Sequence, residues 1–571
     1  MKKVFAAILI ASMLFTLAGC AAQSEAGSVG TGVPGEVDKI DWSGYDALLE
    51  QSGIEPDAEA RSLLLHRAEE MLMDSGAVIP YAFNSEYYLC RSDITGIFMD
   101  SMGIFCFERA QRTNSDADTP VRICAVSDIS SLDPASDLTV AIGILSRLFF
   151  GGLLRSSEDG ALVPDMAESY EVSEDGLTYT FQIREGLRWS DGTVLDADDF
   201  VYTWKRNTAP ETAGSGRELF NVINGFGDEL AVFSEENGRV FRVELSSPCV
   251  YFPELCAYPL FCPVPQHAVE GAEGYRDENG NIVGLRAWSN EAGFPCSGPY
   301  VLSEWKRGET MVLKKNPYYY DAENIPTETL ELMLSSEALT CYSAYEVGDL
   351  DVLYSAIPGD VLHEKMKDPE FHLMTSPNIS AIYFNVNSAL FAGMTQEEAA
   401  TFRYAVALAL DRQFLLDIAL NNGSELANTY VPSCIGDGTG RLFCETTDAY
   451  QYPYETGYLP GNADLEGARE LLRSIGFVFG NDGKLVSPIS IDFTYSGAAS
   501  ERIAACLQAD LAQLGIILQL HSVESSIFWE ECRSGHYDMC DTGWIADFND
   551  PVSFLTIFTS GAESNICQLG E

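Results

Sequence analysis

The part of the sequence that decides the fold lies between residues 164 and 206. It opens with Pro164-Asp165-Met166-Ala167-Glu168-Ser169-Tyr170, continues with Asp175-Gly176-Leu177-Thr178-Tyr179-Thr180-Phe181, and then reads Arg184-Glu185-Gly186-Leu187-Arg188-Trp189-Ser190-Asp191-Gly192. From Leu177 to Ile183, large apolar residues recur at every second position. This alternation predicts a strand with one buried face.

A hairpin and a helix are predicted after this strand. Glu185-Gly186 and Asp191-Gly192 supply turn residues on either side of the short segment 187–189. Asp196 then begins a run with apolar Phe200 and Trp204 at helical spacing, and the acidic residues suit the positive N-terminal end of a helix.

These segments resemble the signature of the family 5 extracellular solute-binding proteins, the peptide and nickel receptors of ABC importers. Six further blocks agree in order, and together they cover nearly the whole mature chain: Ser131-Leu132-Asp133-Pro134, Ser297-Gly298-Pro299-Tyr300, Asn316-Pro317-Tyr318, Gly348-Asp349-Leu350-Asp351, Tyr383-Phe384-Asn385-Val386-Asn387 and Ala409-Leu410-Asp411-Arg412. Most of these residues are expected to build the scaffold, because Gly-Pro and Asn-Pro pairs are turn formers and Tyr383 and Phe384 suit a core.

The resemblance implies an α/β fold: a periplasmic-binding-protein-like (type II, class C) two-lobed hinge fold with an additional small domain. A chain of 571 residues also exceeds what one core normally serves. The expected organisation is a signal peptide (1–19), a lipid-anchored linker (20–37), a segment completing lobe two (38–79), lobe one (80–155 and 266–375), the extra domain (156–265) and lobe two (376–571).

The first residues predict export. Lys2 and Lys3 precede an apolar run that is too short to span a membrane comfortably, which is typical of a signal peptide. Leu17-Ala18-Gly19-Cys20 resembles a bacterial lipobox, so Cys20 is expected to be lipidated; the alternative is an ordinary cleaved signal that ends near a cysteine. Residues 21–36 are small and polar, like a flexible tether. We therefore expect an extracytoplasmic protein, anchored by lipid at the cell surface or in the periplasm.

Charge and cysteine content restrict the partners. A net charge of −51 disfavours nucleic acid and anionic lipid surfaces as partners. The 15 cysteines permit disulfides, such as Cys249–Cys256 or Cys434–Cys444, but their irregular spacing slightly favours free thiols. Only six histidines are present, scattered along the chain, so no metal site and no cofactor is expected. We expect a monomer.

The order of the segments departs from the family pattern. In the family, the block containing Trp-x-Ala-Asp is followed by about another hundred residues, whereas here Glu571 follows Trp544-Ile545-Ala546-Asp547 closely. Segments resembling that missing end stand at the front, in residues 45–98, and include an expected helix at 60–74 with apolar Leu63, Leu64, Ala68, Met71 and Leu72. We interpret this as a circular permutation, with residues 113–119 joining the old ends; the alternative is a fusion remnant.

Asp547 is the best candidate for a ligand-binding residue. In oligopeptide-binding members of the family, the matching aspartate pairs with the α-ammonium group of the peptide, and a buried cation needs such a partner. The alternative is that Asp547 caps a local turn. Trp544, Ala546 and Asn549 are expected beside it in the ligand cleft. Some members place a basic residue shortly before the tryptophan for the peptide carboxylate, but Asp541 stands there in this chain, so the ligand length stays open.

The function implied is the capture of short peptides and their delivery to the permease subunits of an ABC transporter. An enzyme is disfavoured, since no Gly-x-Ser-x-Gly nucleophile motif occurs. A receptor for a nickel chelate, an opine or an oligosaccharide, or a peptide sensor, remains an alternative.

Overall fold

Two lobes share one sheet in the computed structural model, which describes residues 37 and 39–570 apart from 101, 114, 116, 117, 127, 136–138, 159, 213–215, 279, 355 and 456. The sheet has 11 strands in the order β13-β14-β15-β6-β16-β1-β17-β21-β19-β20, with β18 paired to β1. Its strands are β1 (Val78–Cys90), β6 (Val121–Val126), β13 (Tyr300–Lys306), β14 (Thr310–Lys315), β15 (Thr329–Leu334), β16 (Val352–Tyr354), β17 (Phe371–Phe384), β18 (Glu425–Leu426), β19 (Ile489–Tyr495), β20 (Ile516–Ser522) and β21 (Met539–Ile545).

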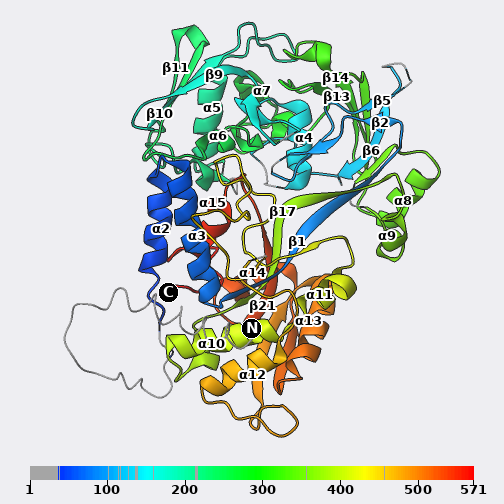
Figure 1. The fold of residues 1–571 in the computed structure, drawn as a ribbon. Coiled ribbons are helices and arrows are strands. Elements are labelled where there is room, and N and C mark those ends of the chain that lie inside the picture. Colours follow the sequence, from blue (N-terminus) through cyan, green and yellow to red (C-terminus); the bar gives the residue numbers. More distant parts are fainter. Residues whose placement is uncertain are drawn as a thin grey trace.

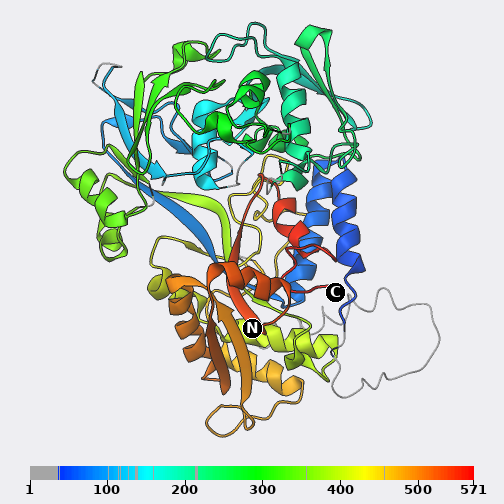
Figure 2. The ribbon, with the colours of Figure 1, turned by 180° about the vertical axis from the view of Figure 1, so that it is seen from behind.

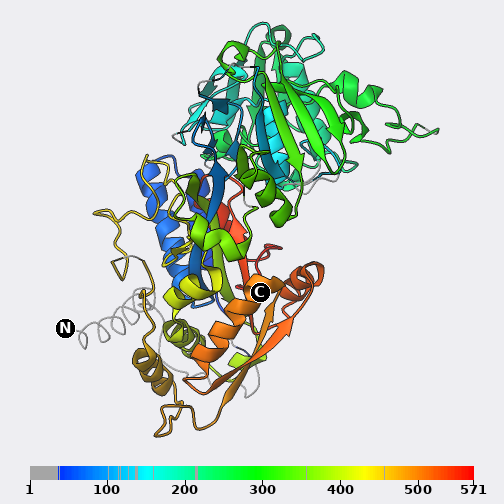
Figure 3. The same ribbon diagram turned by 90° about the vertical axis from the view of Figure 1, so that its right-hand side faces the viewer.

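The long strands β1 and β17 connect the lobes. They pair with each other, while β1 also pairs with β16 of lobe one at Tyr88–Cys90 and β17 pairs with β21 of lobe two from Asn378 to Phe384. In Figures 1 and 2 they run from the upper lobe into the lower one, and Figure 3 shows the same arrangement from the side. The pairing of β1 with β17 is irregular at two places in this crossing: β1 has one extra residue between Pro80 and Ala82, and β17 has extra residues opposite Phe83–Ser85.

The predicted strand, hairpin and helix are confirmed. Strand β10 (Thr178–Ile183) buries Tyr179, Phe181 and Ile183, and helix α5 (Ala197–Thr208) begins at Asp196, which forms a capping box with Asp199. The extra domain comprises α5, the short helix α6 (Phe252–Leu255) and a four-stranded sheet in the order β11-β12-β10-β9. Its other strands are β9 (Ala167–Val172), β11 (Val232–Glu235) and β12 (Val240–Glu244). This domain lies beside lobe one in Figure 1.

Both lobes also contain helices. In lobe one these are α4 (Val140–Phe149), α7 (Gln266–Gly271), α8 (Ala338–Glu346) and α9 (Gly359–Lys365). In lobe two they are α10 (Gln396–Ala409), α11 (Arg412–Phe414), α12 (Leu465–Ser474), α13 (Gly497–Leu511), α14 (Ser525–Arg533) and α15 (Val552–Leu555). Across the part of the chain that the structure describes, no helix is both long and apolar enough to cross a membrane.

The first helices, α2 (Ser43–Ile54) and α3 (Ala58–Asp74), pack against the last residues of the chain. The Tyr45 hydroxyl donates to the Leu555 carbonyl at 2.7 Å, and Trp42 Nε1 donates to the Phe558 carbonyl at 2.9 Å. Figure 1 shows both helices beside α15 on the side of lobe two. Because these bonds are buried, the N-terminal segment is part of the core of lobe two.

The next segment packs on lobe one. It contains four short strands: β2 (Ile94–Thr95), β3 (Phe98–Met99), β4 (Phe105–Cys106) and β5 (Gln111–Arg112). Arg147 on α4 pairs with Asp100 and Glu108, at 3.0 Å each, and the Thr327 hydroxyl donates to the Ala110 carbonyl at 2.7 Å. Residues 77–112 therefore continue from lobe two into lobe one along β1.

The buried face of α3 differs from the one predicted. Ala68 and Leu72 are buried as expected, but Leu63, Leu64 and Met71 are only partly so. Their places are taken by polar side chains, namely Arg61, His66 and Glu69. The helix is turned toward these residues because each has partners elsewhere in lobe two: Arg61 pairs with Asp550, His66 stacks on aromatic rings, and Glu69 accepts two backbone N–H groups.

Candidate functional site

A large cavity of about 1050 Å³ lies between the extra domain and lobe two. One wall comes from the extra domain: Gly216, Glu218, Leu219, Asn221, Val222, Tyr251 and Leu255. The other comes from lobe two: Trp529, Arg533, Trp544, Asp547, Phe548, Val552, Ser553, Thr556, Ile557, Gly561, Ala562, Glu563, Ser564 and Ile566. Its volume suits a ligand of several residues, since small-molecule sites commonly measure about 300–1,000 Å³.

Asp547 lies in this cavity with its carboxylate unpaired among the described residues. It follows β21, and its backbone N–H donates to Ser553 Oγ at 2.7 Å, which fixes the main chain while leaving the side chain free. Burial raises the pKa of Asp547 to about 6, and the carboxylate in turn contributes to the raised pKa of Tyr258, a residue that follows α6. A half-buried carboxylate without a cation has the chemistry to accept a positively charged ligand group.

The turn after Asp547 is held by a different aspartate. Asp550 Oδ1 accepts the Val552 N–H at 2.9 Å, and both Asp550 oxygens accept from Arg61, at 2.8 and 2.9 Å. This bidentate ion pair is buried and ties α3 to the start of α15. The alternative role of Asp547 was to cap this turn. Asp550 forms the capping hydrogen bond instead.

Of the other predicted site residues, Trp544 lines the cavity whereas Ala546 and Asn549 hold the neighbouring main chain. Trp544 lines the cavity, and its Nε1 donates to the Ser553 carbonyl at 2.8 Å. Ala546 is buried and its N–H donates to the Pro377 carbonyl at 2.9 Å. Asn549 Oδ1 accepts the Gly436 N–H at 3.1 Å. Only Trp544 of these three shares the cavity lining with Asp547.

Two lining residues on α14 were not predicted from the sequence. Arg533 and Trp529 face the same cavity as Asp547, and both are exposed. Asp541, where some family members carry a basic residue, is instead buried and accepts the Tyr81 hydroxyl at 2.8 Å, and burial raises its pKa to about 6. The cavity thus contains a cationic side chain, but it comes from a helix and not from the strand before Trp544.

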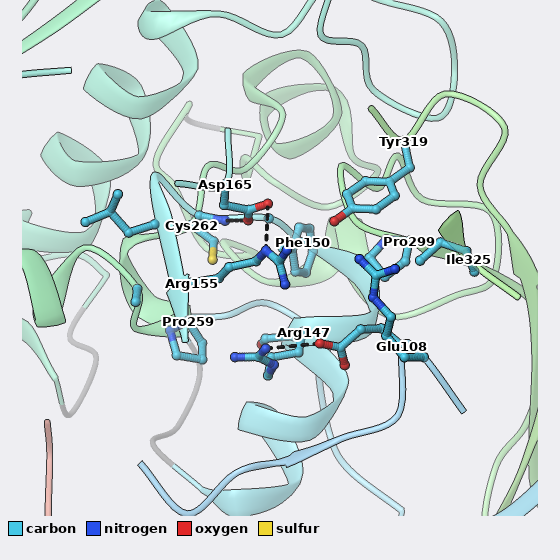
Figure 4. Close-up of a pocket in the computed structure, with 16 residues that line it drawn as sticks. Glu108, Arg147, Phe150, Arg155, Asp165, Pro259, Cys262, Pro299, Tyr319 and Ile325 are labelled. Atoms are coloured by element: carbon cyan, nitrogen blue, oxygen red, sulfur yellow. Dashed lines mark hydrogen bonds and ion pairs between the residues drawn. The ribbon is translucent and has the colours of Figure 1, made fainter. Parts of the chain in front are cut away.

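A second cavity lies between lobe one and the extra domain (Figure 4) and is too small for a peptide. It measures about 40 Å³, enough for a few water molecules. Arg147 and Arg155 line it and form ion pairs with Glu108 and Asp165, respectively. The positive charges of these two arginines are therefore neutralised within the wall. Separately, within the described ranges no group of three His, Cys, Asp or Glu side chains is arranged to hold a metal ion.

Known proteins resemble the chain over most of its length. The periplasmic oligopeptide-binding protein OppA of Salmonella typhimurium is 29% identical over 453 residues, which are 77% of each chain. The dipeptide-binding protein DppE of Bacillus subtilis is 27% identical over 425 residues, 72% of each chain.

Solved structures share the fold. The unliganded open form of the periplasmic murein tripeptide-binding protein MppA gives a TM-score of 0.62 at 23% identity, covering 80% of this chain and 84% of that protein. Haemophilus influenzae OppA in complex with the peptide RPPGFSPFR gives a TM-score of 0.57 at 22% identity, with coverages of 79% and 84%. The model of the bacterial extracellular solute-binding proteins, family 5, matches residues 161–565. Because this match spans well over half of the chain, the protein belongs to the family 5 bacterial extracellular solute-binding proteins.

Proposed function

We propose that the protein captures short peptides in the cavity beside Asp547 and delivers them to the permease subunits of an ABC transporter. The observation that carries this proposal is the unpaired, half-buried carboxylate of Asp547 in a cavity of about 1050 Å³. Membership of family 5 and the names of the relatives, oligopeptide- and dipeptide-binding proteins, support the same ligand class.

In this function Asp547 accepts the α-ammonium group of the peptide. Ionisation of the carboxylate costs less once a cation lies against it, so ligand and carboxylate stabilise each other. Trp544 forms part of the wall, while Ala546 and Asn549 hold the main chain of the site segment. Arg533 lines the same cavity and supplies a positive charge for an acidic group on the ligand. The protein acts as a receptor and catalyses no reaction on the peptide.

The remaining features concern location. The protein works outside the cytoplasm, as a monomer held to the membrane by lipid on Cys20. That residue, the signal peptide (1–19) and most of the linker (20–37) lie outside the described residues. The relatives named as periplasmic proteins support an extracytoplasmic place of action.

The chain is a circular permutation in which residues 38–79 complete lobe two. The buried bonds of Trp42 and Tyr45 to the C-terminal residues and the packing of residues 77–112 on lobe one support this reading over a fusion remnant. Cleavage at a protease site engineered between residues 113 and 119 tests it. The two fragments should elute together under native conditions and separate in denaturant; separation without denaturant would refute the permutation.

Native mass spectrometry of the purified protein tests the ligand class. The wild type should carry co-purified peptides of mixed sequence, and Asp547→Ala should lose most of them. Glu563→Gln is the matched control, because Glu563 lines the same cavity and its substitution removes a negative charge elsewhere in it. Equal peptide loads in all three proteins would discard Asp547 as the anchor, and a bound metal chelate or sugar would move the protein to another ligand class.

A further inference from the structure

A small hairpin in lobe two brings two cysteines close together. Gly436 and Leu442 form an antiparallel bridge. The Asp437 N–H donates to the Arg441 carbonyl at 3.0 Å, and the Phe443 N–H donates to the Ile435 carbonyl at 2.8 Å. These two bonds flank the bridge, which makes residues 436 and 442 a non-hydrogen-bonded pair. The pairing ends there, because the Ile435 N–H donates to the Pro432 carbonyl at 3.1 Å and the Glu445 N–H donates to the Leu442 carbonyl at 3.1 Å. Cys434 and Cys444 therefore lie in the two turns just beyond the paired residues.

The two thiols are near neighbours, as a disulfide requires. Burial raises the pKa of Cys434, and the nearby Cys444 thiol adds to that rise. The Cys444 Sγ lies 3.5 Å from the carbonyl oxygen of Ser433, the residue next to Cys434, so its side chain points toward the opposite strand. Both cysteines are half-buried and within reach of small reagents, whereas most of the described cysteines are buried.

We propose that Cys434 and Cys444 form a disulfide through exchange with an external disulfide, either a small molecule or the active-site disulfide of a thiol oxidoreductase. The structure holds the pair as two thiols. The thiolate of Cys444 attacks one sulfur of the external disulfide, and the other sulfur leaves as a thiolate. Cys434 then attacks Cys444 Sγ and releases the second thiolate. The cysteine pair is oxidised, the external disulfide is reduced, and the two protein thiol protons end on the two released thiols.

Burial slows this exchange without preventing it. It raises the pKa of Cys434 to about 12 and also raises the pKa of Cys444, so little thiolate is present at neutral pH. We therefore expect the rate of disulfide formation to increase with pH.

The hairpin contacts both the ligand segment and α3. The Gly436 N–H donates to Asn549, two residues after Asp547. The Phe443 ring stacks on His66 with 4.0 Å between centroids, and Arg441 pairs with Glu59 at 2.7 Å. A cross-link at the base of the hairpin restricts the unfolded chain and holds these contacts in place. The disulfide therefore braces lobe two behind the proposed peptide site and does not depend on the nature of the ligand.

Peptide mapping of the wild-type protein tests the proposal. The protein is incubated with oxidised glutathione, its remaining thiols are blocked with an alkylating reagent, and it is digested without reductant. We expect one cross-linked peptide joining residues 434 and 444, restored to two alkylated peptides by prior reduction. Cys506 is the control, since it is also half-buried and should stay alkylated. Alkylation of both Cys434 and Cys444 after oxidation, stable glutathione adducts on each, or a cross-link to a different cysteine would overturn the proposal.

Thermal unfolding gives a second measure. The oxidised wild type should unfold at a temperature a few degrees higher than the reduced protein, and this difference should be absent from the double variant Cys434→Ser/Cys444→Ser. Cys506→Ser should keep it. Identical melting temperatures for the oxidised and reduced wild type would show that the disulfide does not stabilise lobe two.

Discussion

The rings of Tyr251 and Phe548 stack face to face, with 4.5 Å between their centroids and 7° between their planes. Tyr251 precedes α6 in the extra domain and Phe548 follows Asp547 in lobe two, so the stack joins the two walls of the cavity. We expect a double-mutant cycle of Tyr251→Ala and Phe548→Ala to give a coupling free energy of about 0.5–1.5 kcal/mol in chemical unfolding. Additive effects of the two single changes would mean that the stack does not hold the walls together.

Peptide affinity should depend on the ionisation of Asp547. Burial raises its pKa to about 6, and only the ionised carboxylate pairs with an ammonium group. Affinity should therefore be full at pH 7–8 and fall as the pH drops through about 6. Titration calorimetry from pH 5 to pH 8 measures this. Asp547→Asn should bind weakly and lose this pH dependence; an unchanged profile in the variant would assign the titration to another group.

The same carboxylate should lower the stability of the empty protein. A folded pKa of about 6 lies above the ordinary 3.8, so the fold favours the protonated acid. Stability therefore decreases as the pH rises from about 4 to 6, and the cost is fully present above pH 6, at about 1.4 kcal/mol per unit of pKa elevation for a fully desolvated group. Ligand-free Asp547→Asn should melt at a higher temperature than the wild type at pH 7 and at the same temperature near pH 4. A lower melting temperature at pH 7 would contradict this.

The buried pair of Arg61 and Asp550 should be costly to break. Arg61→Ala leaves the Asp550 carboxylate buried without its cation, and such losses typically destabilise by about 3–5 kcal/mol. Arg67→Ala on the exposed face of the same helix is the control and should stay within about 0.5 kcal/mol of the wild type. Denaturant unfolding of both variants measures the difference. Similar values would show that α3 is not anchored through Arg61.

Local structure could be predicted from the sequence because the residues that determine it are near one another along the chain. The alternation at 177–183 and the acidic start of α5 at Asp196 need no distant partner, and both are confirmed. The buried face of α3 was predicted wrongly, because Arg61 is buried in an ion pair with Asp550. The two residues are 489 positions apart in the sequence. No spacing rule connects such residues.

The site was only partly predictable for a related reason. Asp547 and Trp544 stand in a recognisable motif, and the structure places both on one cavity. Arg533 and Trp529 carry no motif, and they line that cavity only because α14 is packed beside β21 and the extra domain lies opposite. The closeness of Cys434 and Cys444 likewise depends on a hairpin and the turns beyond it, which cysteine spacing alone does not determine.

The packing of α2 against the last residues also sets an order for biosynthesis. Tyr45 and Trp42 leave the ribosome 510 and 516 residues before Leu555 and Phe558, the residues whose carbonyls they bind. At about 5–20 residues per second, the first helices wait on the order of half a minute or longer for their partners. Lobe two therefore cannot finish folding before residues 555–558 have been synthesised, and a chain truncated before residue 555 lacks the residues against which its first helices pack.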